Sequence, residues 1–372
     1  MVLSFLFGTR VCVATVFAGV CGLALSAPIP MSEPCHSPAK FLPGERVAFV
    51  GDSITHAGGY ITYMQMFLME LYPTNPPHLY NCGVNGDTAG SFLLTKRHEW
   101  DVLPLQPDRV FIMMGMNDVN RDLWKTVEPT SEEASELRTR ALVEYEKNMR
   151  QLVKAILPKS KNVVLMTPTP YDQYGKFDGH ALLGCNDPGL SFCANIVRKI
   201  SFEMDLPIVE LYFPLTQHLK DSAFERLCGD DRIHPGCIGH SLIASLILRS
   251  CGHSSMDDVV VAKELRDDPC AGAAVYYAKA LSAFRRIAEY KKVIRSMGAD
   301  PADAQSDDRA LDRWLESGLG AGWYGAAQLA VRDYRDLRGR EVQLSHASEA
   351  AFNLLSATVK ARVATPGRRH DD

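Results

Sequence analysis

Short apolar runs recur along the first two thirds of the chain, and each ends at glycine or polar residues. The runs are rich in β-branched residues and show no polar alternation, which is typical of strands in a parallel sheet covered on both faces. We therefore predict strands at residues 47–50, 78–81, 109–114, 162–167 and 206–209.

Between these runs, apolar side chains recur at helical spacing, most clearly over residues 60–71 and 137–157. Strands that alternate with helices indicate βαβ units and a doubly wound parallel sheet. Residues 40–250 are accordingly predicted to form one α/β domain.

Beyond Cys251 the strand pattern stops, and four amphipathic helices are predicted. We expect a helical extension over residues 257–362 and a disordered tail over 363–372. We expect the extension to cover the first domain or to form the interface of a homo-oligomer. The less favoured alternative is that it is an independent binding module. The helical positions are Tyr277, Leu281, Phe284 and Ile287; Leu311 and Trp314; Tyr324, Ala327, Val331 and Tyr334; and Ala347, Ala351, Leu354 and Thr358.

The N-terminus has the pattern of a secretory signal peptide. Arg10 precedes an apolar stretch over residues 11–25, and small residues follow at Ser26 and Ala27. An uncleaved anchor is the alternative, but a membrane span usually needs about 20 apolar residues. We expect residues 1–27 to be removed and the mature protein to be secreted or otherwise extracytoplasmic, with no stable membrane insertion.

Two of the ten cysteines lie in the predicted leader, so an even number remains. An even set of cysteines in an exported protein favours disulfides. The close pairs Cys185/Cys193, Cys228/Cys237 and Cys251/Cys270 are the candidates, although sequence does not fix their connectivity. No CxxC occurs, which gives a structural zinc site little support.

Composition excludes several classes of protein. With 46% hydrophobic and 23% charged residues, the chain is globular rather than disordered or fibrous. The formal net charge of -4 over 372 residues gives no basic footprint for nucleic acid, so we expect no nucleic-acid partner.

Polar clusters follow the predicted strands. They are Gly51-Asp52-Ser53, residues 81–88, residues 115–118 and, in a late loop, residues 231–235. The carboxyl ends of parallel strands meet at one edge of the sheet, where such folds bind ligands. We therefore expect the four clusters to form one site.

The residue types in these clusters fit acyl transfer. Ser53 is a candidate nucleophile, His234 its base, and Asp231, three residues before His234, the group that orients the imidazole. The backbone N–H groups of Ser53 and Gly86 and the side-chain amide of Asn117 are candidate donors to an oxyanion. Taken alone, Ser53 is more typical of a helix N-cap, and the other clusters favour the nucleophile. The chemistry requires no cofactor, and no metal site is predicted.

In order and spacing, the sequences Gly51-Asp52-Ser53, Gly86, Gly115-x-Asn117-Asp118 and Asp231-x-x-His234-Pro235 resemble the four signature blocks of the SGNH (GDSL-type) hydrolase superfamily. The resemblance covers roughly residues 45–245. It implies a three-layer α/β/α, flavodoxin-like fold and a Ser-His-Asp esterase that works through an acyl-serine intermediate.

Substrate choice is expected to depend on loops, chiefly residues 171–195. Aromatic rings beside amide and carboxyl groups suit a sugar, so the favoured substrate is a small acyl ester, most of all an acetylated glycan. The alternatives are a lysophospholipase, lipase or thioesterase for longer acyl chains, or a catalytically silent glycan-binding protein. Candidate substrate contacts are His56, Trp124, Tyr171 and Tyr174.

Overall fold

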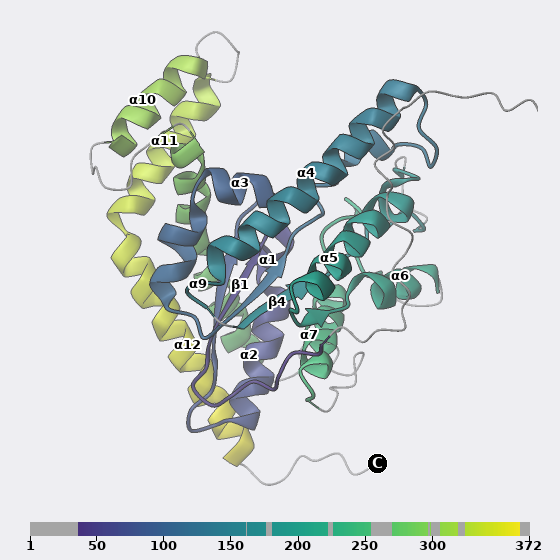
Figure 1. The fold of residues 1–372 in the computed structure, drawn as a ribbon. Helices are drawn as coiled ribbons and strands as arrows, with labels where there is room; N and C mark the ends of the chain where they lie inside the picture. Colours follow the sequence, from purple (N-terminus) through teal and green to yellow (C-terminus); the bar gives the residue numbers. More distant parts are fainter. Residues whose placement is uncertain are drawn as a thin grey trace, which may run out of the picture. The chain divides into compact units, whose positions relative to one another are not determined.

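The computed structural model describes residues 36–160, 162–175, 181–221, 226–253, 270–296, 298, 306–318 and 324–364 (Figure 1). The predicted leader lies outside these residues, as does the predicted tail beyond residue 364. The side chains of Trp314, Tyr324 and Ala327 are also outside the described part, so their predicted packing stays a prediction.

Within the described residues, the strands form a parallel sheet in the order β2-β1-β3-β4-β5. All five predicted strands are present, although only two residues of the predicted fifth one pair. β1 is an interior strand between β2 and β3, with Val50 opposite Cys82 of β2 and Ile112 of β3. The bounds are β1 Arg46–Gly51, β2 His78–Gly83, β3 Arg109–Met113, β4 Asn162–Met166 and β5 Ile208–Val209.

Helices cover both faces of this sheet, which confirms the three-layer α/β/α fold. Helix α2 packs against α7, and α4 packs against α3 and α5, as right-handed crossovers between parallel strands require. The helices of this domain are α1 Ser53–Ala57, α2 Gly59–Leu71, α3 Ala89–Leu94, α4 Glu132–Ile156, α5 Ser191–Glu203, α6 Tyr212–Lys220 and α7 Cys237–Ser250. Short π- or 3-10-helical turns lie at His98–Val102, Leu103–Leu105, Arg121–Trp124 and Cys185–Leu190.

The core explains why β1 is uniformly apolar. Phe49 is fully buried, its ring stacks on that of Phe111 with centroids 4.9 Å apart, and Tyr60 of α2 meets it edge-on at 5.7 Å. Every residue of β1 after Arg46 is buried, so both faces of the strand are packed, and a polar side chain in this run would lose its hydration without gaining a partner.

The described extension consists of α9 Cys270–Ser296, α10 Ser306–Gly318, α11 Tyr324–Gly339 and α12 Glu341–Ala364. Helices α9 and α12 pack on each other and on α2, where Met66, Tyr277 and Leu355 share one buried cluster. The rings of His78 in β2 and Phe352 in α12 stack at 4.3 Å. The extension thus covers the first domain beside its edge strand β2, which shields that edge from other chains.

One predicted face of the extension is wrong. Leu354 is 50% exposed, whereas Ala351, Leu355 and Val359 are buried. These three residues follow each other at intervals of four, so they form one continuous stripe toward α9 and α2. The stripe that includes Leu355 buries larger side chains, which decides how α12 is rotated.

The predicted disulfides are absent among the described cysteines. Cys185, Cys193, Cys228, Cys237 and Cys251 are free thiols, so none of the three proposed bridges forms. Four of these five side chains are buried, where a thiol packs as a small apolar group. Burial raises the pKa of Cys185 to about 12, which disfavours the thiolate needed for disulfide exchange.

The predicted substrate loop at residues 171–195 is described over its two ends, 171–175 and 181–195. The second end is helical from Cys185 onward and runs into α5 at Ser191. The apolar residues Cys193, Val197 and Ile200 lie at helical spacing and form one buried face of α5.

No helix in the described part of the chain is apolar over enough length to span a membrane.

Candidate active site

Asp52, rather than Ser53, caps helix α1. The Asp52 carboxylate accepts a hydrogen bond of 2.9 Å from the Ile54 backbone N–H and is 2% exposed. Burial raises the pKa of Asp52 to about 6. Because Asp52 provides the cap, the Ser53 hydroxyl has no capping role and is available to other groups.

The structure places Ser53, His234 and Asp231 in one chain of hydrogen bonds. Ser53 Oγ lies 2.7 Å from His234 Nε2, and His234 Nδ1 lies 2.5 Å from Asp231 Oδ2. The side chains of His234 and Asp231 are 45% and 48% exposed, so the arrangement opens to solvent. This is the geometry that lets an imidazole take a proton from a serine hydroxyl while a carboxylate orients the ring.

A tight turn orients the histidine. The second oxygen of Asp231, Oδ1, accepts backbone N–H groups from Ile233 at 2.9 Å and His234 at 3.0 Å. Arg232, between them, adopts a left-handed backbone conformation with φ of 64°. Partial burial raises the pKa of Asp231, but the hydrogen bonds from His234 and Ile233 outweigh it and lower the pKa below its ordinary value. The carboxylate therefore stays ionised beside the imidazole.

Two of the three predicted oxyanion donors, Gly86 and Asn117, lie on neighbouring loops, and the third, Ser53, begins helix α1. Gly86 has a φ of 63° in the turn after β2, and a Cβ there would meet nothing within 4 Å. Asn117, after β3, donates through Nδ2 to the Asp87 carbonyl at 2.9 Å and accepts through Oδ1 from Arg121 at 3.0 Å. A side-chain amide carries two N–H groups, so the hydrogen bond to Asp87 fixes the amide and leaves its second donor for a ligand.

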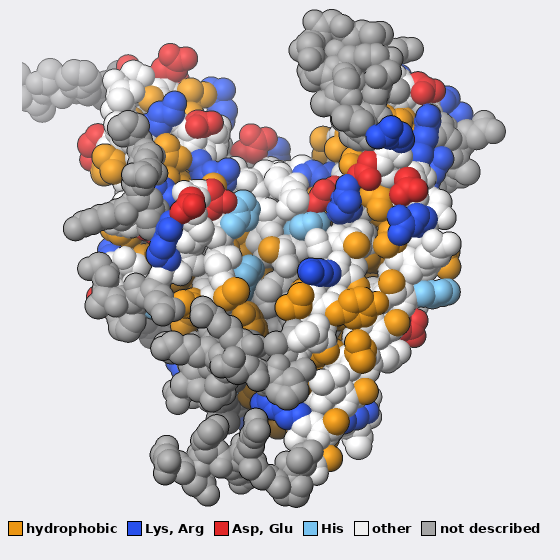
Figure 2. Space-filling model, turned by 180° about the vertical axis from the view of Figure 1, so that it is seen from behind, with side chains coloured by type: hydrophobic (Ala, Val, Ile, Leu, Met, Phe, Trp, Pro, Cys, Tyr) orange, Lys and Arg blue, Asp and Glu red, His pale blue; other side chains and the backbone are white. Residues whose placement is uncertain are grey.

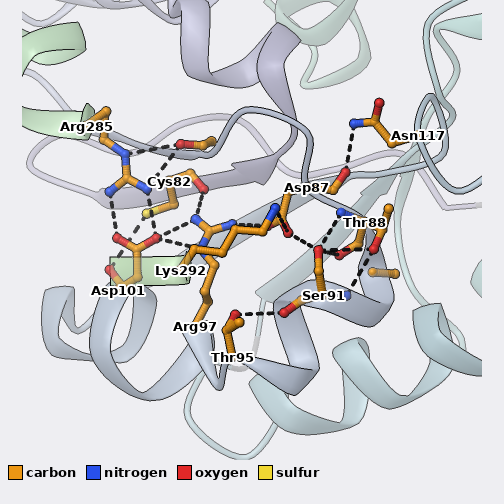
Figure 3. A network of polar contacts seen from close by, with 12 residues as sticks. Cys82, Asp87, Thr88, Ser91, Thr95, Arg97, Asp101, Asn117, Arg285 and Lys292 are labelled. Atoms are coloured by element: carbon orange, nitrogen blue, oxygen red, sulfur yellow. Dashed lines mark hydrogen bonds and ion pairs between the residues drawn. The ribbon is translucent and has the colours of Figure 1, made fainter. Parts of the chain in front are cut away.

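Asp87 joins this site to a buried polar network that the sequence reasoning missed (Figure 3). Its fully buried carboxylate contacts Arg97, Ser91 and Lys292 of α9, the last at 3.1 Å. Opposite charges at positions 97 and 101, one helical turn apart, were a possible signal for part of this network. The link to Lys292 had no local signal, since it joins residues about 200 positions apart.

His56, one of the predicted substrate contacts, is nearly buried and lies against helix α9. It is 7% exposed, and its Nε2 lies 3.1 Å from Glu289 of α9. Burial and the nearby charge of Arg285 lower the pKa of His56 to about 4. Its backbone nitrogen would be 2.1 Å from a Cβ at position 83, so only glycine fits at Gly83.

Two of the other three predicted substrate contacts are also buried. Trp124 is 2% exposed and donates from Nε1 to the Val119 carbonyl, with the Arg138 guanidinium over its ring. Tyr171 is 4% exposed and accepts a hydrogen bond from the Leu182 N–H. Both rings stabilise the loops around the site, because burying an aromatic ring removes a large apolar area from water. Tyr174 remains half-buried, with Lys220 5.3 Å above its ring.

The histidines near the site provide no metal centre in the described residues, which contain no group of three or more His, Cys, Asp or Glu able to hold an ion. His240, for example, accepts the Tyr60 backbone N–H at 3.3 Å, and burial lowers its pKa to about 4.

On the face shown in Figure 2, histidine side chains lie among acidic and basic ones, beside a larger apolar area.

Comparison with known proteins connects this geometry to one family. A model of the GDSL-like lipase/acylhydrolase family matches residues 49–242, which contain every residue of the site described above except those of α9. An acetylxylan esterase of Geobacillus stearothermophilus is 29% identical over 237 residues, covering 56% of this chain and 94% of that protein.

Two solved structures are similar. A gut microbial diltiazem-metabolizing enzyme, BT4096, aligns with a TM-score of 0.69 at 18% identity, over 89% of this chain and 97% of the other. This similarity supports the fold, including helices beyond the family match. The Geobacillus stearothermophilus acetylxylan esterase Axe2 aligns with a TM-score of 0.45 at 27% identity, over 58% and 98% of the two chains.

Proposed function

The chain belongs to the GDSL-like lipase/acylhydrolase family and is therefore a carboxylic ester hydrolase, and we propose that it removes short acyl groups, above all acetyl, from a carbohydrate. The observation that carries the catalytic part is the alignment of Ser53 Oγ, His234 and Asp231, with separations of 2.7 and 2.5 Å. No cofactor enters this proposal.

In the first half-reaction, Ser53 Oγ attacks the ester carbonyl carbon while His234 Nε2 takes the hydroxyl proton. Asp231 stabilises the imidazolium that results. Negative charge develops on the carbonyl oxygen, where the N–H groups of Ser53 and Gly86 and the second N–H of Asn117 donate to it. When the tetrahedral intermediate collapses, the sugar oxygen leaves with the proton from His234, and an acyl-Ser53 ester remains.

In the second half-reaction, His234 deprotonates a water molecule that attacks the acyl-serine. The same donors stabilise the second tetrahedral intermediate. Its collapse returns the proton to Ser53 Oγ and releases the carboxylic acid. The exposure of His234 supports this step, because water must reach its Nε2 once the alcohol has left.

The choice of an acetylated carbohydrate rests on the similarity to an acetylxylan esterase and on the polar surroundings of the site. A lipase or thioesterase for longer acyl chains is the competing reading. The decisive measurement is kcat/KM for p-nitrophenyl esters from acetyl to long acyl chains, with Ser53→Ala as control.

A steep fall with chain length, abolished by Ser53→Ala, is the expected result, followed by acetate release from acetylated xylan or a related glycan. A maximum at long chains would overturn the short-acyl assignment. Ester hydrolysis that persists in Ser53→Ala would overturn the nucleophile.

We also propose that the protein acts outside the cytoplasm after loss of residues 1–27. The apolar stretch at residues 11–25 with small residues after it supports this proposal. N-terminal sequencing of the protein from its native source should begin at Ala27 or Pro28. An intact Met1 in the active protein would contradict export by this route.

A further inference from the structure

Helix α9 holds the loop that carries Gly86 through three side chains on one of its faces. Arg285, Glu289 and Lys292 lie at intervals of four and three residues, so they project from the same side of the helix. The segment they contact runs from Gly83, the last residue of β2, into the loop that follows. All three side chains lie outside the range that matches the family model.

Each of the three contacts a different point on the loop. Arg285 donates from Nε and a terminal nitrogen to the Gly83 carbonyl, both at 3.2 Å. Glu289 accepts from the Asn85 amide at 2.5 Å. Lys292 Nζ lies 3.1 Å from Asp87 Oδ1. The contacts fall on residues 83, 85 and 87, so they lie on both sides of Gly86.

The anchoring of α9 is itself buried and charged (Figure 3). Arg285 is 4% exposed and forms an ion pair with both oxygens of Asp101, at 2.6 and 2.8 Å. Burial raises the pKa of Asp101, but the charges of Arg285 and Arg97 outweigh it and lower the pKa to about 2. The pair is therefore ionised at neutral pH, and it ties α9 to the segment beside the loop.

Asp87 links this position to two of the three predicted oxyanion donors, Gly86 and Asn117. Its carboxylate, 0% exposed, faces the cations of Arg97 and Lys292. Its carbonyl accepts the Asn117 amide at 2.9 Å, and its backbone follows Gly86 directly. A buried carboxylate that loses one of two cations must shift or draw in water. Either change would displace the Asn117 amide and the Gly86 N–H together.

We propose that Lys292, carried by the C-terminal extension, is a positioning residue that sets the oxyanion donors through Asp87. In this proposal Lys292 acts through its ion pair with Asp87 and not through contact with the substrate. This inference rests on the proposed serine-esterase mechanism and gives the extension a part in it.

The experiment compares Lys292→Met, Lys292→Arg and the matched control Lys291→Met. Lys291 is a neighbouring α9 lysine that pairs with Glu341 at 2.7 Å, away from the loop. The readouts are kcat/KM for p-nitrophenyl acetate and the inhibition constant of phenylboronic acid, whose serine adduct is tetrahedral and directs an oxygen at the oxyanion donors. Thermal unfolding of each full-length variant is recorded beside them.

For Lys292→Met, kcat/KM should fall about tenfold and the inhibition constant should rise by a similar factor, because a donor moved out of line loses part of the 10²- to 10³-fold effect of deleting it. Lys292→Arg should recover most of both values, and Lys291→Met should match the wild type. Unchanged values in Lys292→Met, a loss that arginine does not recover, or the same loss in Lys291→Met would overturn the proposal.

If Lys292→Met does not fold, Lys292→Gln, which keeps a donor to Asp87 without the charge, is compared with Lys292→Arg under the same criteria. Ser53→Ala separates the two levels of inference. Full activity in Ser53→Ala would overturn the proposed mechanism itself, whereas an inactive Ser53→Ala beside a Lys292→Met of wild-type activity would overturn only the role of Lys292.

Discussion

The Asp87 carbonyl accepts a hydrogen bond of 2.9 Å from Asn117 Nδ2, and this contact joins the loop after β2 to the loop after β3. The loop of Gly86 and the loop of Asn117 are thereby tied into one unit. Preorganised donors of this kind stabilise an oxyanion without reorganising during the reaction. The following predictions test this unit, the triad and the fold that holds them.

Asn117→Ala should lower kcat for p-nitrophenyl acetate by about 10²- to 10³-fold, because it removes one oxyanion donor, worth about 3 kcal/mol. Unfolding in urea should be little changed, since the residue is only partly buried. The control is Asn195→Ala in α5, which should keep full kcat. The Asn195 side chain is exposed and contacts Arg198. Equal rates for Asn117→Ala and the wild type would exclude this donor.

Asp231→Asn should reduce kcat by about 10³- to 10⁴-fold, because an amide cannot stabilise the imidazolium and can favour the wrong tautomer of His234. The neighbouring Asp230 is the matched control. It is exposed and pairs with Arg226 at 2.7 Å, so Asp230→Asn should retain wild-type kcat. Steady-state kinetics on both variants checks the assignment, and the reverse ranking would transfer the role to Asp230.

Asp118→Asn should change how stability depends on pH. Burial raises the pKa of Asp118 to about 7, with further increases from Asp52 and Asp87, against the hydrogen bond from the Ala89 N–H. The folded protein therefore binds this proton more tightly than the unfolded chain does. The contribution to stability is present below about pH 4 and is lost as the pH rises toward 7.

The asparagine variant keeps an acceptor for Ala89 and has no proton to lose. Relative to wild type, its free energy of unfolding in urea should therefore increase between pH 5 and pH 8. Asp122→Asn, at an exposed position, is the control and should run parallel to wild type. A parallel curve for Asp118→Asn as well would show that the carboxylate ionises without cost.

Gly83→Ala should destabilise the fold by more than about 2 kcal/mol, because its Cβ would lie 2.1 Å from the His56 backbone nitrogen and the packed surroundings cannot yield cheaply. Gly272→Ala in α9 is the matched control. A Cβ there meets nothing within 4 Å, and alanine favours helix over glycine by up to about 1 kcal/mol. Urea unfolding should shift in opposite directions for the two variants, and equal midpoints would refute the close approach at Gly83.

Much of the architecture follows from the sequence by local physics. An apolar run such as residues 47–50 has to be buried on both faces, and the alternation of such runs with amphipathic helices leaves few folds besides a doubly wound parallel sheet. Because strand ends of such a sheet converge, the sequence also predicts that Ser53, Gly86 and Asn117, which follow β1, β2 and β3, share one edge. Asp231 and His234 lie in a late loop that follows no strand, so only the tertiary structure shows that His234 lies 2.7 Å from Ser53.

Only the tertiary structure decided the surroundings of these residues. Asp52 and Ser53 are equally good caps by composition, and geometry selected Asp52. Three predicted substrate contacts have suitable side chains but are buried in the structure: His56, Trp124 and Tyr171. The pairing of Lys292 with Asp87 depends on how α9 lies against the loop after β2. Periodicity shows which residues share a face of one element, whereas the face of another element that they meet depends on the packing of the whole chain.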